Sequence, residues 1–75
     1  MDDFMGDEMK SLQKQIEAEG KFVGKGEVFV EQCWEVHKYD GKNYAVLREV
    51  FFGSKLGLWV RVREIESSEV SQYIK

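Results

Sequence analysis

The chain has 75 residues, of which 43% are hydrophobic and 13% aromatic, and its net charge at pH 7 is −3. This composition supports a packed core and argues against a largely disordered chain. No apolar run approaches the roughly 20 residues of a membrane span, and the N-terminal residues lack a signal-peptide core. The single cysteine, Cys33, excludes an internal disulfide and fits a reducing compartment. We therefore expect one soluble, cytoplasmic domain over residues 1–75.

Charge is distributed unevenly along the chain. Residues 1–20 carry six acidic and two basic side chains, a net charge of −4, whereas residues 21–75 carry eight acidic and nine basic side chains, a net charge of +1. Proteins that bind duplex DNA tightly are normally basic, so this balance argues against that class. The acidic N-terminal segment is interpreted as a solvated helix face, with a docking element for a basic partner as the alternative.

The first predicted element is an amphipathic helix over residues 7–19. Its apolar side chains recur at steps of four, three and four, at Met5, Met9, Leu12 and Ile16. Gly20 is typical of the residue that follows a helix, and residues 1–6 are expected to fray. We expect the apolar stripe to pack on a sheet, with a helix–helix dimer seam as the alternative.

A β-hairpin is predicted around Asp40 and Gly41, a pair that favours a two-residue turn with positive φ at both positions. We expect its strands at residues 27–38 and 43–52. Residues 22–26, with two glycines, are interpreted either as a turn before the first strand or as a bulge within it. The turn predicts four opposing pairs, which are Tyr39 and Lys42, Val36 and Ala45, Trp34 and Leu47, and Val30 and Phe51.

A third strand is predicted over residues 58–65, and a short helix that Ser67 or Ser68 would cap over residues 69–74. A fourth strand over residues 70–74 is the alternative to this helix. The expected fold class is α+β, with an N-terminal amphipathic helix packed on a three-stranded antiparallel β-meander and a short C-terminal helix. A small SH3-like barrel is the alternative, since five short strands can be drawn over residues 22–74.

Regular alternation divides the predicted sheet into two faces. The first is apolar and is expected to pack against the N-terminal helix. It consists of Val28, Val30, Trp34, Val36, Ala45, Leu47, Phe51, Leu58, Val60 and Val62. The second mixes apolar, aromatic and charged side chains. It consists of Phe29, Glu31, Cys33, Glu35, His37, Tyr39, Tyr44, Val46, Arg48, Val50, Phe52, Trp59, Arg61, Arg63 and Ile65.

One helix cannot cover both faces, so we expect the second face to be covered by another element. The candidates are the C-terminal segment, with arginines paired to Glu31 and Glu35, a second copy of the chain, or a different partner. Single-stranded nucleic acid is one such partner, because Trp59 and Phe52 could stack on bases while arginines contact phosphates.

The sequence lacks the residues of a metal or catalytic site. Cys33 and His37 lie about 13 Å apart along a strand, too far to share a metal ion. Cys33 is interpreted as a packed thiol, and the spacing of Glu31 and Glu35 prevents them from sharing a proton. Glu49 faces Gln32 on the predicted core side, an unusual position for a carboxylate. We expect no cofactor, no metal and no enzymatic activity.

The function expected from these observations is a small protein–protein interaction module, an accessory, adaptor or inhibitor protein that forms a homodimer. Trp59→Ala is expected to weaken association with little loss of fold. The alternative is a single-stranded nucleic-acid-binding protein that uses the same face. The predicted partner-binding residues are Trp59, Phe52, Arg61, Arg63, Arg48 and Phe29.

Overall fold

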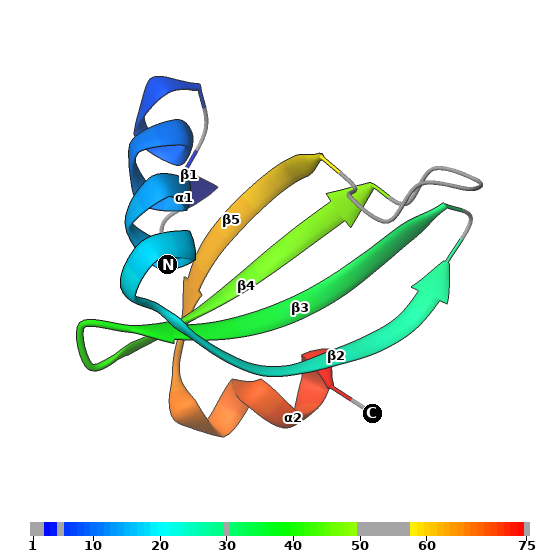
Figure 1. Ribbon diagram of the computed structural model, residues 1–75. Coiled ribbons are helices and arrows are strands. Elements are labelled where there is room, and N and C mark those ends of the chain that lie inside the picture. The colour runs from blue at the N-terminus through cyan, green and yellow to red at the C-terminus, as the bar shows by residue number, and fades with distance from the viewer. Residues whose placement is uncertain (1–2, 5, 30, 50–57, 75) are drawn as a thin grey trace.

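Figure 1 shows the computed structural model of the chain, which describes residues 3–4, 6–29, 31–49 and 58–74. The fold is α+β, as predicted, with an N-terminal helix, an antiparallel sheet and a short C-terminal helix. The sheet has the linear order β1-β5-β4-β3-β2 among the described strands, so the alternative SH3-like barrel is not formed. The elements are β1 (Asp3–Phe4), α1 (Asp7–Glu19), β2 (Lys21–Phe29), β3 (Gln32–Tyr39), β4 (Lys42–Glu49), β5 (Trp59–Ile65), η1 (Ser67–Glu69) and α2 (Val70–Tyr73).

The prediction of three strands is wrong, because the segment expected to form one long first strand is divided between β2 and β3. The chain reverses next to Glu31, which adopts a φ of 67°, a conformation uncommon for a residue other than glycine. The sheet therefore has four long strands, and β1 adds two residues at the edge of β5. Gly24 and Gly26 lie within β2, which has register shifts between Phe22 and Gly24 and between Lys25 and Val28.

The predicted hairpin is confirmed in β3 and β4. Tyr39 pairs with Lys42, Val36 with Ala45, and Trp34 with Leu47. Asp40 and Gly41 have φ values of 53° and 74°, as the two-residue turn requires. The predicted pair of Val30 and Phe51 lies outside the described residues.

Helix α1 has the predicted bounds and leads directly into β2. Gly20, the residue that follows it, has an extended backbone, with a φ of −76°, instead of a left-handed one. A Cβ at Gly20 would lie 2.5 Å from the carbonyl oxygen of Ile16, so close approach of the backbone explains the glycine. The chain passes from β1 at one edge of the sheet, through α1, to β2 at the opposite edge (Figure 1).

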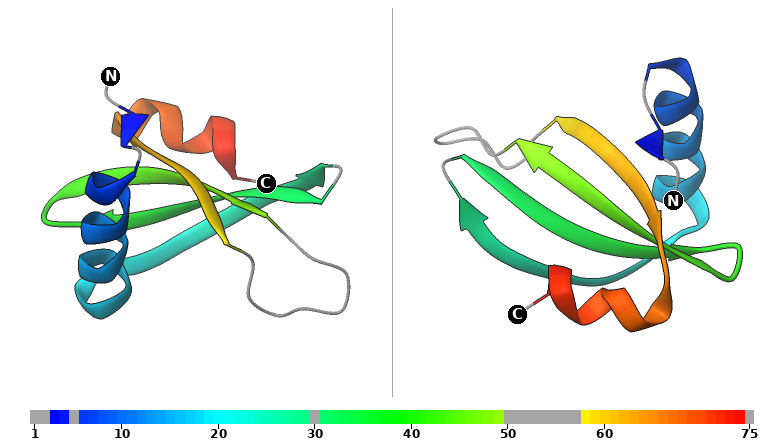
Figure 2. Two further views of the ribbon diagram at one scale, coloured as in Figure 1. Left: turned by 90° about the horizontal axis from the view of Figure 1, so that it is seen from above. Right: turned by 180° about the vertical axis from the view of Figure 1, so that it is seen from behind.

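Helix α1 covers the sheet face opposite to the one predicted, and the two helices lie on opposite sides of the sheet (Figure 2). Ile16 of α1 is buried with Tyr44, Val46 and Trp59, which were predicted to lie on the second face, and with Val62, which was predicted to lie on the first. The C-terminal segment packs on the other face, where Val70, Tyr73 and Ile74 surround the buried Val36, Ala45 and Ile65. Both faces are apolar enough to take a helix, so alternation alone does not assign them.

A bulge in β5 explains why the third strand was assigned wrongly. Leu47 pairs with Arg61, but the next residue of β4, Arg48, pairs with Trp59, so Val60 is an extra residue. Trp59 and Arg61 therefore lie on opposite faces. Leu58 and Val60, predicted to face the core, are 65% and 39% exposed.

The C-terminal helix begins earlier than predicted and is divided into η1 and α2. The backbone N–H of Glu66 donates to the carboxylate of Glu69, 3.1 Å away. Glu66 is the residue that precedes η1, so the prediction that Ser67 or Ser68 caps the helix is wrong. The hydroxyl of Ser67 instead accepts a hydrogen bond from the side chain of Asn43, at 3.3 Å.

Candidate functional site

The six predicted partner-binding residues do not form one face of the described structure. Trp59 is only 6% exposed and lies in the core, contrary to its expected position. Arg48 lies on the same face, with its guanidinium carbon 5.9 Å from the centre of the Trp59 ring. Arg61 and Arg63 lie on the opposite face because of the bulge at Val60. Phe52 and the side chain of Phe29 are outside the described part of the structure.

Two of these arginines, Arg63 and Arg48, have hydrogen-bond partners inside the fold. Arg63 donates a hydrogen bond from Nη1 to the hydroxyl of Tyr73, at 3.3 Å. Arg48 donates from Nη1 to the carboxylate of Glu35, at 3.4 Å. These contacts hold the two side chains against α2 and β3, so neither arginine extends freely toward solvent.

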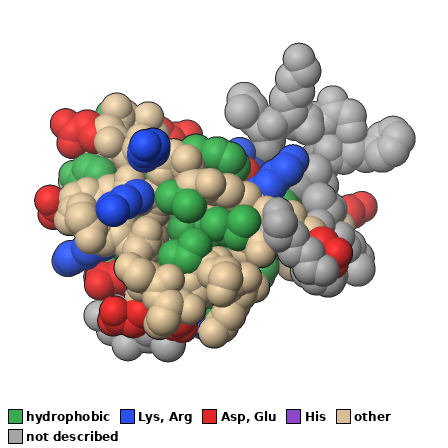
Figure 3. All heavy atoms as spheres, turned by 90° about the horizontal axis from the view of Figure 1, so that it is seen from below, with side chains coloured by type: hydrophobic (Ala, Val, Ile, Leu, Met, Phe, Trp, Pro, Cys, Tyr) green, Lys and Arg blue, Asp and Glu red, His purple; other side chains and the backbone are tan. Residues whose placement is uncertain are grey.

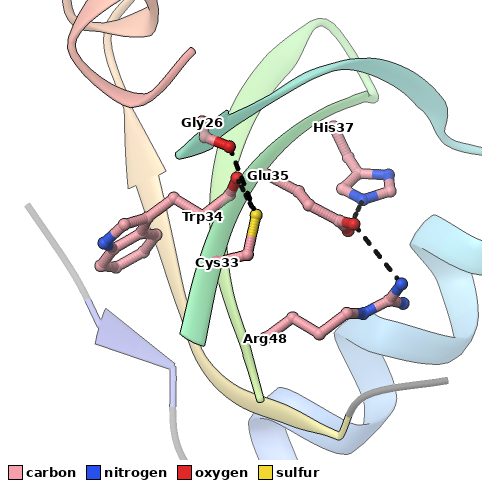
Figure 4. Close-up of polar contacts among 6 residues, drawn as sticks. All are labelled: Gly26, Cys33, Trp34, Glu35, His37 and Arg48. Carbon is pink, nitrogen blue, oxygen red and sulfur yellow. Dashed lines mark hydrogen bonds and ion pairs between the residues drawn. The ribbon is translucent and has the colours of Figure 1, made fainter. Parts of the chain in front are cut away.

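Glu35, His37 and Arg48 form a half-buried polar group on the α1 side of the sheet, which we call the Glu35 cluster. The carboxylate of Glu35 lies between the other two side chains, while Trp34 points away from them (Figure 4). Nε2 of His37 is 3.2 Å from Oε1 of Glu35. The His37 ring also lies 5.5 Å from the rings of both Phe22 and Trp59.

Electrostatics keep the Glu35 carboxylate ionised. The hydrogen bond from His37 lowers the pKa of Glu35 below its ordinary value of 4.5, and the charges of Arg48 and Lys25 act in the same direction, while burial opposes them. A carboxylate with a lowered pKa is a weak base at neutral pH. The Glu35 cluster is therefore suited to holding β3 and β4 together, not to proton transfer.

Cys33 is buried, which agrees with its interpretation as a packed thiol. Its Sγ lies 3.5 Å from the carbonyl oxygen of Gly26 and 3.4 Å from that of Trp34, so the thiol donates within the sheet (Figure 4). The described residues contain no group of three or more His, Cys, Asp or Glu side chains that could hold a metal ion.

Two exposed hydrophobic side chains lie at the edge of the sheet on β2. Phe22 is 53% exposed and Val23 is 44% exposed. β2 is the last strand in the sheet order, so its outer side has no neighbouring strand among the described elements. Sequence reasoning missed this surface because it treated residues 22–26 as a turn or a bulge and ended the sheet one strand earlier.

A view from the end of the molecule that carries α2 shows hydrophobic side chains gathered at the centre of that face, with Lys or Arg side chains beside them (Figure 3). On this face Trp34, Tyr73 and Ile74 are only partly buried, packed against the buried Val36, Ala45 and Ile65.

A groove lies near the opposite edge of the sheet, between β1 and α1. Its volume is 430 Å³. Phe4 and Leu12 provide an apolar floor, and Asp7 and Glu8 are exposed acidic side chains beside it. We call this surface the α1 groove, and its lining residues are Phe4, Asp7, Glu8, Ser11, Leu12 and Gln15.

Comparison of the chain with family models, curated proteins and solved structures found no match. Among the described residues, no helix has the length and apolar character required to cross a membrane.

Proposed function

We propose that this protein is a small, non-enzymatic protein–protein interaction module that forms a homodimer through the edge strand β2. The observation that carries the proposal is the unpaired outer side of β2, together with the exposed side chains of Phe22 and Val23. Unpaired strand edges with apolar side chains are favoured sites for the addition of another strand.

The residues of β2 are compatible with pairing between two copies. Antiparallel pairing about Gly24 would place Lys21 opposite Glu27 of the partner subunit, and two-fold symmetry would repeat this contact. Both side chains are exposed, so they can approach across the interface.

The expected dimer is closed and weak. A pair of nine-residue strands is smaller than a standard interface, which buries about 800 Å² on each partner, so we expect a Kd in the micromolar range. Two-fold pairing uses the same strand, β2, on both subunits, so the dimer is closed and is not expected to grow into fibres.

Sedimentation equilibrium from micromolar to millimolar concentration tests this proposal. The wild-type mass should rise from 8.8 kDa toward twice that value. Val23→Lys should remain monomeric, because a lysine at this edge brings like charges together in the dimer. The matched control is Leu58→Lys, which changes another exposed hydrophobic residue outside β2 and should dimerise as the wild type does. A wild-type monomer at every concentration, or equal effects of the two variants, would contradict the proposal.

The structure gives no support to the nucleic-acid alternative. Trp59 is buried under α1, so its ring is not available to stack on a base. Arg48 and Arg63 bond to Glu35 and Tyr73. We therefore propose protein binding alone, in an adaptor or inhibitor role.

A further inference from the structure

We infer that the α1 groove binds a basic amphipathic helix of a partner protein. This inference rests on the proposed function as an interaction module and adds the chemistry of its partner. It does not require the dimer, because β1 and β2 lie at opposite edges of the sheet and the α1 groove and the β2 edge are separate surfaces.

The shape of the α1 groove suits a helix. Asp7, Ser11 and Gln15 are spaced four residues apart on α1, and Glu8 and Leu12 form the neighbouring row. Side chains at this spacing lie above one another, so the groove follows α1 for about 12 Å, or roughly two turns. Phe4, fixed by the pairing of β1 with Val62, lines the other side. A second helix packed along α1 would present about two turns to this surface.

The chemistry of the α1 groove favours a partner helix that has one apolar face with basic side chains flanking it. Phe4 and Leu12 are partly buried against the core and leave apolar surface in the groove. No ion pair joins Asp7 or Glu8 to a basic side chain within the described part of the chain, and none of the six lining residues is basic. Leucine-like side chains would meet the floor, and lysine or arginine would meet the two carboxylates.

Long-range electrostatics favour the same partner. The net charge of −4 over residues 1–20 belongs to the segment that contains the groove, while the rest of the chain is nearly neutral. A basic helix would therefore be attracted toward this end of the molecule, and the attraction would weaken as salt is added.

Fluorescence anisotropy with synthetic peptides tests the inference. The probe is a labelled peptide with leucines at helical spacing and lysines elsewhere. Two comparison peptides replace the lysines by glutamate or introduce a central proline that breaks the helix. The lysine peptide should bind with a Kd that rises with salt, the glutamate peptide should not bind, and the proline peptide should bind much more weakly.

Two variants with the same charge change locate the binding. Ser11→Lys puts a cation inside the groove and should raise the Kd of the lysine peptide by about tenfold, a change of about 1.4 kcal/mol. Ala18→Lys adds the same charge at an exposed position of α1 outside the groove and should change the Kd less than about twofold. Both variants replace exposed helix residues with a good helix former, so both should fold.

Several results would overturn the inference. If Ser11→Lys and Ala18→Lys raise the Kd of the lysine peptide equally, the peptide is attracted by the net charge of the protein alone and does not bind in the groove. Tight binding of the proline peptide would show that the occupant is an extended chain. Loss of self-association in Ser11→Lys would show that the groove holds a second copy. Val23→Lys should bind the lysine peptide as the wild type does, so failure of the groove appears in anisotropy and failure of the dimer appears in sedimentation.

Discussion

At the residue scale, Trp59 contributes to stability from a buried position among Ile16, Val46 and Val62. We expect Trp59→Ala to lower the free energy of unfolding by about 3–5 kcal/mol, because it opens a large cavity in the α1 side of the core. Trp59→Phe should lower the free energy of unfolding much less. It keeps an aromatic ring and removes an indole N–H that has no acceptor within the described structure.

Urea denaturation followed by circular dichroism measures these changes. Val60→Ala is the control. The Val60 side chain, next to Trp59 in the sequence, is 39% exposed, so this substitution should change the free energy of unfolding by under about 1 kcal/mol. A Trp59→Ala variant as stable as the wild type, with weakened self-association, would show that Trp59 is an interface anchor after all.

Glu35 makes stability depend on acidic pH. Its pKa is lowered in the folded state, mainly by the hydrogen bond from His37, so the unfolded chain takes up a proton more readily. The stabilisation is complete above the ordinary value of 4.5 and is lost as pH falls through the lower pKa of the folded state. At neutral pH, Glu35→Gln should therefore cost about 1–2 kcal/mol, the range for a charge-assisted hydrogen bond that is partly screened.

The pH dependence separates this charge effect from a simple packing change. Urea unfolding at neutral pH and at a pH well below 4.5 should show the difference between wild type and Glu35→Gln shrinking with acidification. Glu64→Gln is the matched control, because Glu64 is more exposed and lies 4.0 Å from Lys42. A constant difference between wild type and Glu35→Gln at both pH values would contradict the assignment.

At the element scale, local sequence signals identified α1 and the β3–β4 hairpin with the correct register. Both depend on patterns that act over a few residues, namely the helical spacing of the apolar stripe and the Asp-Gly turn. The turn at Glu31 was missed because a glutamate at positive φ carries no sequence signal. The bulge at Val60 was missed because a β-branched residue in an alternating strand predicts regular pairing.

The contact between α2 and β2 depends on the absence of a side chain at Gly26. A Cβ there would collide with the carbonyl oxygen of Tyr73 in α2. Gly26→Ala should therefore displace α2 and lower stability by about 1–3 kcal/mol, the usual effect of overpacking. Gly24→Ala is the control, because its nearest neighbour is the flexible side chain of Ile74, at 3.0 Å.

Hydrogen exchange and urea denaturation measure the two glycine variants. Gly26→Ala should speed exchange of the α2 amides and lower stability more than Gly24→Ala does. Equal stability of Gly26→Ala and the wild type, with α2 amides exchanging at the wild-type rate, would show that α2 is not held against β2 as described.

At the scale of the whole molecule, the sequence predicted a sheet with two apolar faces and a need for two covers. It did not predict which helix packs on which face, because each face contains enough apolar side chains to pack against a helix. For the same reason, the candidate site in the structure differs from the site predicted from the sequence. Once α1 covers Trp59, the large hydrophobic residues exposed in the described part of the chain are those of the β2 edge and of the start of β5. These positions depend on strand boundaries that the sequence leaves open.

The most direct test of the account is amide hydrogen exchange of β2 measured at several protein concentrations. If two copies pair through this edge, the outward-facing amides of Lys21–Phe29 should exchange more slowly at high concentration, while those of the β3–β4 hairpin stay unchanged. The same β2 amides in Val23→Lys should exchange quickly at every concentration. Exchange of the wild-type β2 amides at one rate across the whole range would contradict the proposed interface.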